Sequence, residues 1–216
     1  MTITIIPAKP FGESKKRLSS VLSHQERILL SQNLLRHTIL AAMPLGPVVV
    51  VSRSKNVRDF AAGIGANTLI ENHHDLNDAV RQGIDWAQAH GASSVLILPL
   101  DLPLLTTTAL EKLVDPGYQP SPTIVIAPCR HHQGTNALVL TPPCLIPPRF
   151  GPHSFAKHQQ LAQKAGITPT ICHSPQLAFD LDTPEDWLEF MALEAKHKPD
   201  TLGSPIQSPK YYRHRG

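Results

Sequence analysis

Three aspartates that follow apolar runs are the side chains of this sequence best suited to chemistry. Asp101 ends the run in VLILPLDLPLL, and Asp180 and Asp182 alternate in FDLDTPEDW. Residues two apart on a strand share a face, so a strand over Leu177–Asp180 would aim Asp180 and Asp182 into one small volume. Two such carboxylates repel each other unless a cation lies between them. Because oxygen ligands suit Mg²⁺, the pattern predicts a Mg²⁺ site that also takes substrate phosphates.

A basic segment near the amino terminus could supply cations for such phosphates. The stretch IPAKPFGESKKRL, Ile6–Leu18, carries four cationic side chains: Lys9, Lys15, Lys16 and Arg17. Lysine neutralises phosphate oxygens as a point charge and arginine can bind two of them at once, so a loop of this composition could wrap a polyphosphate. A solvated basic loop is an equally good interpretation of the same residues. The Walker pattern of P-loop ATPases is absent.

Two later motifs could bind a second anion. QGTNALVL contains Thr135, and RFGPHSFAKH contains Gly151 and Ser154. Hydroxyls and backbone N–H groups at turns and at a helix start suit a phosphate or a carboxylate. Ordinary turn chemistry favours the same residue types, so this pattern alone does not decide between the two. No serine or cysteine has the local signature of a nucleophile.

Strands that alternate with helices would position these residues. The first half predicts strands at Thr2–Pro7, Pro47–Ser52, Asn67–Ile70 and Ser94–Pro99, and helices after the capping box of Ser23 and Glu26, at Lys55–Ala62 and at Leu76–His90. The second half predicts strands at Thr123–Ala127, Ala137–Thr141, Pro169–His173 and Leu177–Asp180, and helices at His153–Ala165 and from Pro184. The pattern indicates an α/β fold with a mostly parallel central sheet and helices on both faces.

Length and composition limit the class of protein. The 216 residues are 41% hydrophobic and 17% charged, which favours one folded domain over residues 1–195. The stretch 196–216 lacks periodicity and is predicted to be a flexible tail. The net charge of +3 without a long basic run argues against a nucleic-acid partner. No apolar run approaches about 18 residues and the start lacks a signal peptide, so we expect no membrane partner and a cytoplasmic location.

The motifs, taken together, resemble a known family. In order, IPAKPFGESKKRL, HDLNDAV, LPLDLPLL, QGTNALVL, RFGPHSFAKH and FDLDTPED are similar to the CofC/FbiD family, the phospholactate or phosphoenolpyruvate guanylyltransferases of deazaflavin coenzyme biosynthesis. The similarity runs from about Thr2 to Trp187. It implies the three-layer nucleotidyltransferase fold, related to that of the nucleotide-diphospho-sugar transferases. This chain reads S-K-K-R-L at Ser14–Leu18 where the family usually reads A-K-[ST]-R-L, so Lys16 is an additional cation.

The resemblance also implies roles for individual residues. Mg²⁺ would be held by Asp101, Asp180 and Asp182, with Asp101 also catalytic. The acceptor would contact Thr135, Gly151 and Ser154. Lys9 and Lys15 would act in catalysis and bind the nucleotide, which Asn77 would border. The partners would be GTP and a small phosphorylated carboxylic acid, whose phosphate attacks the α-phosphorus of GTP and expels pyrophosphate.

Three questions stay open at this level. The acceptor could be phosphoenolpyruvate, 2-phospholactate or 3-phosphoglycerate, because no short motif visibly distinguishes them. The number of metal ions and the presence of a homodimer are equally undecided. Two alternatives are a nucleotidyltransferase of the molybdopterin or sugar-phosphate type and a GTP-binding module without turnover. A Gly-rich nucleotide loop would favour the former, but Ile6–Lys16 contains only Gly12.

Overall fold

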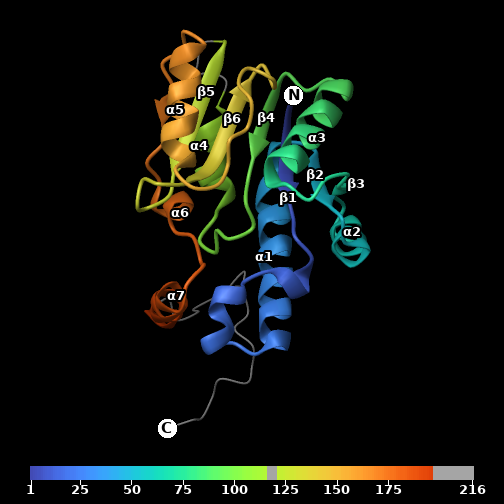
Figure 1. The fold of residues 1–216 in the computed structure, drawn as a ribbon, viewed down its shortest axis with the longest axis vertical. Helices are drawn as coiled ribbons and strands as arrows, with labels where there is room; N and C mark the ends of the chain where they lie inside the picture. Colours follow the sequence, from blue (N-terminus) through green and yellow to red (C-terminus); the bar gives the residue numbers. More distant parts are fainter. Residues whose placement is uncertain (116–120, 197–216) are drawn as a thin grey trace.

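A central sheet lies between two layers of helices (Figure 1) in the computed structural model, which describes residues 1–115 and 121–196. In these residues the seven strands have the order β3-β2-β1-β4-β6-β5-β7. They are β1 (Thr2–Pro7), β2 (Val48–Ser52), β3 (Asn67–Ile70), β4 (Ser94–Ile97), β5 (Thr123–Pro128), β6 (Thr135–Thr141) and β7 (Thr170–Ile171). Of the tail predicted over 196–216, all but the first residue lies outside the described residues.

The sheet is mostly parallel, as predicted. Strands β1 to β4 run in one direction, with Ile5 opposite Ile97 across the β1–β4 pair. Strand β6 runs against both β4 and β5, and Ile97 faces Leu138 across the β4–β6 pair. Strand β7 is parallel to β5. Because β6 is reversed, it begins at the edge of the sheet where β4 ends.

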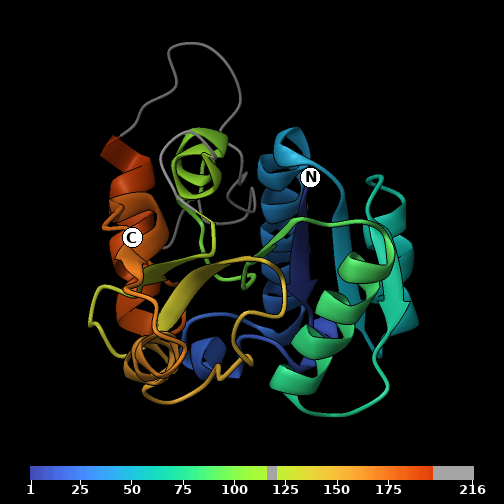
Figure 2. The same cartoon turned by 90° about the horizontal axis from the view of Figure 1, so that it is seen from above.

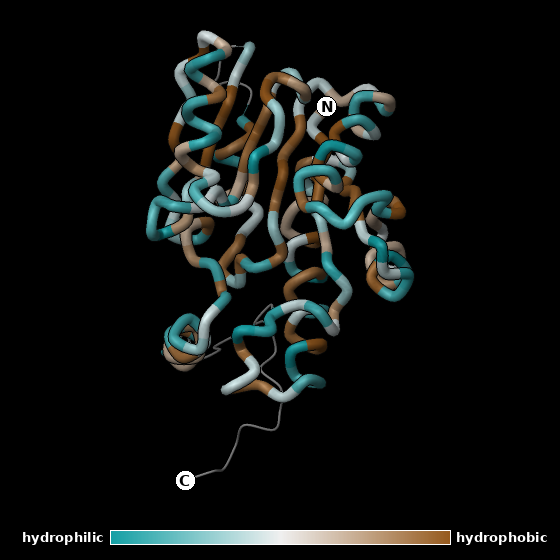
Figure 3. The backbone as a smooth tube through the Cα atoms, viewed as in Figure 1, coloured by the Kyte–Doolittle hydropathy of each residue, from teal (hydrophilic) through white to brown (hydrophobic). Residues whose placement is uncertain are grey.

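Helices cover both faces of the sheet. Helices α1 (His24–Ala42), α2 (Lys55–Ala62) and α4 (Thr107–Val114) pack on one face, and α3 (Leu76–Ala89) and α5 (Ser154–Lys164) pack on the other (Figure 2). Strand residues alternate between the two cores: Ile6 and Val50 face the first, and Ile5 and Val49 face the second. Central strands buried on both faces are accordingly apolar along their length (Figure 3).

A third apolar cluster lies beyond the carboxyl ends of the strands. It joins α1 to the short 3₁₀ helix η2 (Lys16–Ser20) and to α7 (Pro184–Lys196), which lies away from the sheet in Figure 1. The 3₁₀ helix η1 (Phe11–Glu13) precedes η2, and η3 (Met43–Leu45) follows α1. Fully buried Leu18 and Leu181 both belong to this cluster. The basic segment and the aspartate segment therefore share one small core.

One predicted strand is wrong. Residues predicted as the strand Leu177–Asp180 form the short helix α6 (Pro175–Ala178) followed by irregular backbone. Pro175 at the first helical position favours a helical turn there. The Asn136 amide donates to the Leu177 carbonyl at 2.9 Å, and the Arg130 backbone N–H donates to the Ala178 carbonyl at 2.9 Å, in place of a partner strand.

The other predicted elements occur, with small differences in length. The capping box of Ser23 and Glu26 is present at the start of α1. The strand predicted at Pro169–His173 is reduced to β7, of two residues. Helix α4 was not predicted, although the Thr106 hydroxyl accepts the Ala109 N–H as an amino-terminal cap. Its eight residues give too short a periodic pattern to distinguish it from a loop.

We expect Gly83→Ala to destabilise the fold because α3 lies against the sheet at this glycine. A methyl group there would come within 2.5 Å of the Ile5 Cγ2 atom in the buried core. This overpacking should lower the free energy of unfolding by about 1–3 kcal/mol, more than the roughly 1 kcal/mol that alanine gains in helix propensity. Urea unfolding measures the change. Gly63→Ala is the matched control, since its methyl group has no contact shorter than 3.4 Å. Equal stability of the two variants would contradict the packing argument.

Candidate active site

A cleft of about 500 Å³ opens at the carboxyl ends of β1, β2 and β4. The chain builds β2 and β3 on one side of β1 and then returns to place β4 on the other side. Open α/β sheets bind ligands at such a reversal of strand order. Charged residues of both signs line the cleft, among them Lys9, Lys15, Arg53, Glu71, Asp101 and Asp182.

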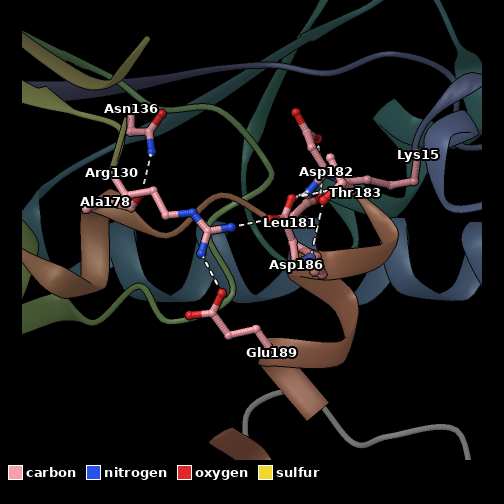
Figure 4. A network of polar contacts seen from close by, with 9 residues as sticks. All are labelled: Lys15, Arg130, Asn136, Ala178, Leu181, Asp182, Thr183, Asp186 and Glu189. Atoms are coloured by element: carbon pink, nitrogen blue, oxygen red, sulfur yellow. Dashed lines mark hydrogen bonds and ion pairs between the residues drawn. The ribbon is translucent and has the colours of Figure 1, made fainter. Parts of the chain in front are cut away.

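Lys15 connects the basic segment to the aspartates (Figure 4). Its Nζ atom donates to the Leu181 carbonyl oxygen at 2.7 Å and to Asp182 Oδ1 at 3.0 Å, and lies 3.8 Å from Asp101 Oδ2. Its side chain is only 8% exposed. The Leu181 N–H donates to the Asp101 carbonyl at 2.9 Å, which ties the two aspartate segments together. The cation between the carboxylates of Asp101 and Asp182 in this structure is thus the Lys15 ammonium group.

The three predicted metal ligands are not equivalent. Asp101 and Asp182 line the cleft, whereas Asp180 is not among the residues that line it. The sequence analysis expected Asp180 and Asp182 to share one face of a strand over Leu177–Asp180, and the structure has no strand there. The Oδ1 atom of Asp180 is buried without a hydrogen-bond partner among the described residues. No three His, Cys, Asp or Glu side chains in that part of the chain are grouped closely enough to hold a metal ion.

Electrostatics nevertheless favour an added cation near these carboxylates. Burial raises the pKa of Asp101, and the charges of Asp182 and Asp180 raise it further against the opposing effect of Lys15. Burial also raises the pKa of Asp180, with Asp182 among the further causes. A carboxylate that is buried beside like charges is stabilised in its ionised form when a cation is bound nearby.

The remaining basic residues differ in how they are held. Lys9 lines the cleft with an exposed side chain, as do Lys16 and Arg17. Arg53, which sequence analysis did not select, makes an ion pair with Glu13. Its Nη1 atom lies 3.9 Å from Glu71 Oε2. Cations therefore lie along the cleft from the end of β1 to the end of β2, as a polyphosphate would require.

The side-chain amide of Asn77 makes two hydrogen bonds with the backbone of Phe150. Its Nδ2 atom donates to the Phe150 carbonyl at 3.2 Å, and its Oδ1 atom accepts the Phe150 N–H at 2.6 Å. The predicted contact with the nucleotide stays a prediction. In this structure the amide joins the start of α3 to the loop that precedes Gly151.

Thr135 and Ser154 come together at the start of β6, as the motifs suggested. The Thr135 N–H donates to Ser154 Oγ at 2.8 Å, and both residues are buried. Gly151 lies in the loop just before α5, and its carbonyl accepts the Ser154 N–H at 3.1 Å. Its φ of +111° is favourable for glycine and strained for other residues. None of the three lines the cleft beside Lys15.

His158, which was not selected from the sequence, organises this second group. Its ring is fully buried, and burial followed by the nearby charge of Lys157 lowers its pKa to about 4. The Arg149 N–H donates to Nε2 at 3.0 Å, so the neutral ring carries its proton on Nδ1 and donates it to Thr135 Oγ1 at 2.9 Å. The Thr135 hydroxyl is left to donate its own proton, which suits an anionic acceptor.

Two other residues were missed as contributors to the site. Asp186 accepts the backbone N–H groups of Asp182 and Thr183, and Arg130 makes an ion pair with Asp186. Asp186 lies in the first turn of α7, where an acidic residue is ordinary and carries no signal of a site. Arg130 has no local signal, because its partner lies 56 residues away.

Comparison with known proteins identifies the family. The profile described as "Guanylyl transferase CofC like" matches residues 2–202. The chain belongs to this family. Among curated CofC relatives, a phosphoenolpyruvate guanylyltransferase of Sphaerobacter thermophilus is 38% identical over 92% of this chain and 94% of its own length. A 3-phospho-D-glycerate guanylyltransferase of Colwellia psychrerythraea is 35% identical (95% and 94%), and a 2-phospho-L-lactate guanylyltransferase of Methanocaldococcus jannaschii is 34% identical (84% and 79%).

Solved structures agree with the fold expected for a CofC protein. A putative nucleotide-diphospho-sugar transferase from Desulfovibrio desulfuricans has a TM-score of 0.74 at 15% identity, covering 91% of this chain and 88% of its own. A CMP:2-keto-3-deoxy-manno-octonic acid synthetase has a TM-score of 0.59 at 14% identity, covering 90% and 98%. These likenesses confirm the nucleotide-diphospho-sugar transferase-like fold. Within residues 1–115 and 121–196, no helix has the length and apolar character to cross a membrane.

We expect the neutral His158 to make stability depend on pH. The folded pKa of about 4 lies below the unfolded value near 6.5, so only the unfolded chain takes up this proton between them. The contribution of His158 is therefore fully present above about pH 6.5 and is lost as the pH falls toward 4, by up to about 3 kcal/mol. Urea unfolding from pH 4 to 7 measures the slope. His158→Gln should flatten that slope, and an unchanged slope in this variant would show that the ring titrates normally.

Proposed function

We propose that this chain transfers GMP from GTP to the phosphate of phosphoenolpyruvate or 2-phospho-L-lactate and releases pyrophosphate. The observation that carries the proposal is the pairing of Lys15 with Asp101 and Asp182 in a cleft at the reversal of strand order. Membership of the CofC family and the names of the relatives support the guanylyl donor and the acceptor class. The activity places the chain in deazaflavin coenzyme biosynthesis.

The reaction needs positioning and charge neutralisation rather than a protein nucleophile. An oxygen of the acceptor phosphate attacks the α-phosphorus of GTP, a new P–O–P linkage forms, and the bond to the β-phosphate oxygen breaks with its electron pair leaving on pyrophosphate. Lys15, with Lys9 at the mouth of the cleft, would offset the charge on the triphosphate and the departing pyrophosphate. Such neutralisation is strongest where the cation is buried, as the Lys15 side chain is.

Asp101 and Asp182, which line the cleft, would hold Mg²⁺ together with substrate phosphates, and Asp180 would join them only after its carboxylate turns toward the cleft, because the three are not grouped closely enough here. The unpartnered, buried Oδ1 atom of Asp180 and the raised pKa of Asp101 fit a bound cation. Because Lys15 lies between Asp101 and Asp182 here, its ammonium group would turn toward the triphosphate when the cation is bound. Bound Mg²⁺ supplies charge stabilisation for phosphoryl oxygens.

The group around Thr135 would receive the acceptor. The Thr135 hydroxyl, oriented by His158, and the Ser154 hydroxyl at the start of α5 can donate to a phosphate or a carboxylate. The positive end of the α5 dipole adds to this preference for an anion. The loop that carries Gly151 is joined to α3 by Asn77, so the acceptor and nucleotide regions keep a fixed separation.

Pyrophosphate release tests the proposed reaction directly. The assay uses Mg²⁺, each of the four nucleoside triphosphates, and phosphoenolpyruvate, 2-phospho-L-lactate or 3-phosphoglycerate, with metal-free controls. We expect release with GTP and with phosphoenolpyruvate or 2-phospho-L-lactate. Release with another nucleotide would indicate a different nucleotidyltransferase, and binding of GTP without any release would indicate a non-catalytic module.

Asp182→Asn should abolish most of the transfer without unfolding the protein. The change removes a charge that faces both Lys15 and the proposed cation, so we expect kcat to fall by about a hundredfold or more. The Asp182 side chain is 41% exposed, so the stability change should stay within about 1 kcal/mol. Glu185→Gln, an exposed neighbour, is the control. Near-normal turnover of Asp182→Asn would remove this aspartate from the mechanism.

A further inference from the structure

Arg130 lies at the junction of three segments that meet behind the aspartates. It belongs to the loop between β5 and β6, and its backbone N–H donates to the Ala178 carbonyl at 2.9 Å. Its guanidinium carbon lies 4.7 Å from the centre of the Phe179 ring. The guanidinium group also pairs with Asp186 and, at 2.6 Å, with Glu189 on α7. Arg130 therefore contacts the chain both before and after the pair Asp180 and Asp182, and Figure 4 shows its guanidinium group beside Asp186 and Glu189.

The Asp186 carboxylate transmits this contact to the site. One oxygen, Oδ1, pairs with Arg130. The other, Oδ2, accepts the backbone N–H of Asp182 at 2.9 Å and of Thr183 at 2.7 Å. A capping role for α7 accounts for the bond from Thr183, and for the bond from the Asp186 N–H to the Thr183 hydroxyl at 3.2 Å. It does not account for the bond from Asp182, which lies one residue outside a capping box.

The same hairpin carries the acceptor group. Thr135 and Asn136 are neighbours on β6, so their side chains point to opposite faces of the sheet. Thr135 turns to His158 and Ser154, and Asn136 donates to the Leu177 carbonyl just before the aspartate segment. The β5–β6 hairpin thus holds the aspartate segment at two points, Asn136 and Arg130.

We propose that Arg130 is a positioning residue for nucleotidyl transfer. Through Asp186 it fixes the backbone of Asp182, and so the direction of the carboxylate that meets Lys15, relative to the hairpin that carries Thr135. The inference rests on the proposed function. In the part of the chain that the structure describes, the Arg130 side chain makes no hydrogen bond or ion pair with Lys15 or Asp182. It acts on Asp182 through Asp186, and its charge also acts on Asp180.

Arg130→Gln is the decisive variant, because it keeps hydrogen-bonding capacity and removes the charge from Asp186. We expect kcat to fall by about 10–100-fold, the range typical for residues that orient a reactive side chain. The acceptor KM should stay nearly unchanged, because Thr135, Ser154 and His158 hold one another independently of Arg130. Arg130→Lys keeps the charge without the planar fork, so its kcat should lie between those of Arg130→Gln and the wild type.

Glu189→Gln is the matched control. Glu189 pairs with the same guanidinium group from the exposed side and makes no contact with the Asp182 backbone. If Arg130 only anchored α7, Glu189→Gln and Arg130→Gln would lower kcat to similar degrees. The positioning role predicts that kcat falls in Arg130→Gln alone.

Amide hydrogen exchange provides a readout that does not depend on turnover. The N–H groups of Asp182 and Thr183 should exchange several-fold faster in Arg130→Gln than in the wild type, and at the wild-type rate in Glu189→Gln. Faster exchange together with the fall in kcat supports the proposal. Unchanged exchange, or unchanged kcat, in a folded Arg130→Gln protein overturns it.

Two further results have defined meanings. If Arg130→Gln does not fold, Arg130→Lys decides by the same two measurements: a lowered kcat with faster exchange supports the proposal, and wild-type values overturn it. If the wild-type protein transfers no nucleotide to any acceptor, the proposed function fails. Amide exchange then still decides whether Arg130 fixes the Asp182 backbone.

Discussion

The buried ammonium group of Lys15 is the interaction on which the site depends. The Lys15 ammonium group donates to the Leu181 carbonyl and to the Asp182 carboxylate, which lie 166 and 167 positions further along the sequence. Without this cation, Asp101 and Asp182 would face each other across a partly buried space at a high electrostatic cost. The loop after β1 and the segment before α7 are therefore held together in two ways. Lys15 attracts the Asp182 carboxylate, and Leu18 and Leu181 pack in the same apolar cluster.

The aspartate segment is held between two cations of different kinds. Lys15 approaches from the cleft on an unbranched, flexible side chain. Arg130 approaches from behind, with a planar guanidinium group engaged by Asp186 and Glu189. Under the proposed function Lys15 would exchange partners during the reaction, whereas Arg130 is held by several contacts. The aspartates would then stay ordered while the charge in the cleft changes.

The sequence predicted those features that depend on local periodicity or on one motif. The alternation of strands and helices and the capping box of Ser23 and Glu26 were accessible in this way. Thr135 and Ser154 lie in separate motifs, and only the family resemblance assigned both to the acceptor. The segment Leu177–Asp180 was misassigned because a short apolar run fits a strand and a helical turn equally well. Asn136 and Arg130 decide its conformation, and no local pattern shows that they are near.

Charge pairing was the harder part to predict for the same reason. The sequence analysis expected a cation between Asp180 and Asp182, but nothing near Lys15 in the sequence shows that its ammonium group lies between Asp101 and Asp182. The pairing of Asn77 with Phe150, 73 residues away, is equally invisible to motif analysis. The neutral state of His158 follows from complete burial, which a sequence of mixed polarity around RFGPHSFAKH does not indicate.

The reversed direction of β6 has a consequence for how this site can vary. In an all-parallel sheet, each loop at the ligand edge leads from a strand into a crossover helix. Here the chain reaches that edge along β5, turns, and leaves along β6, so Thr135 lies at the beginning of a strand. Under the proposed function, the acceptor would meet residues at the starts of β6 and α5, and the nucleotide would meet residues at the ends of β1, β2 and β4. One edge of the sheet therefore combines the beginning of one strand with the ends of three others, and Asn77 and Arg130 fix the two groups relative to each other.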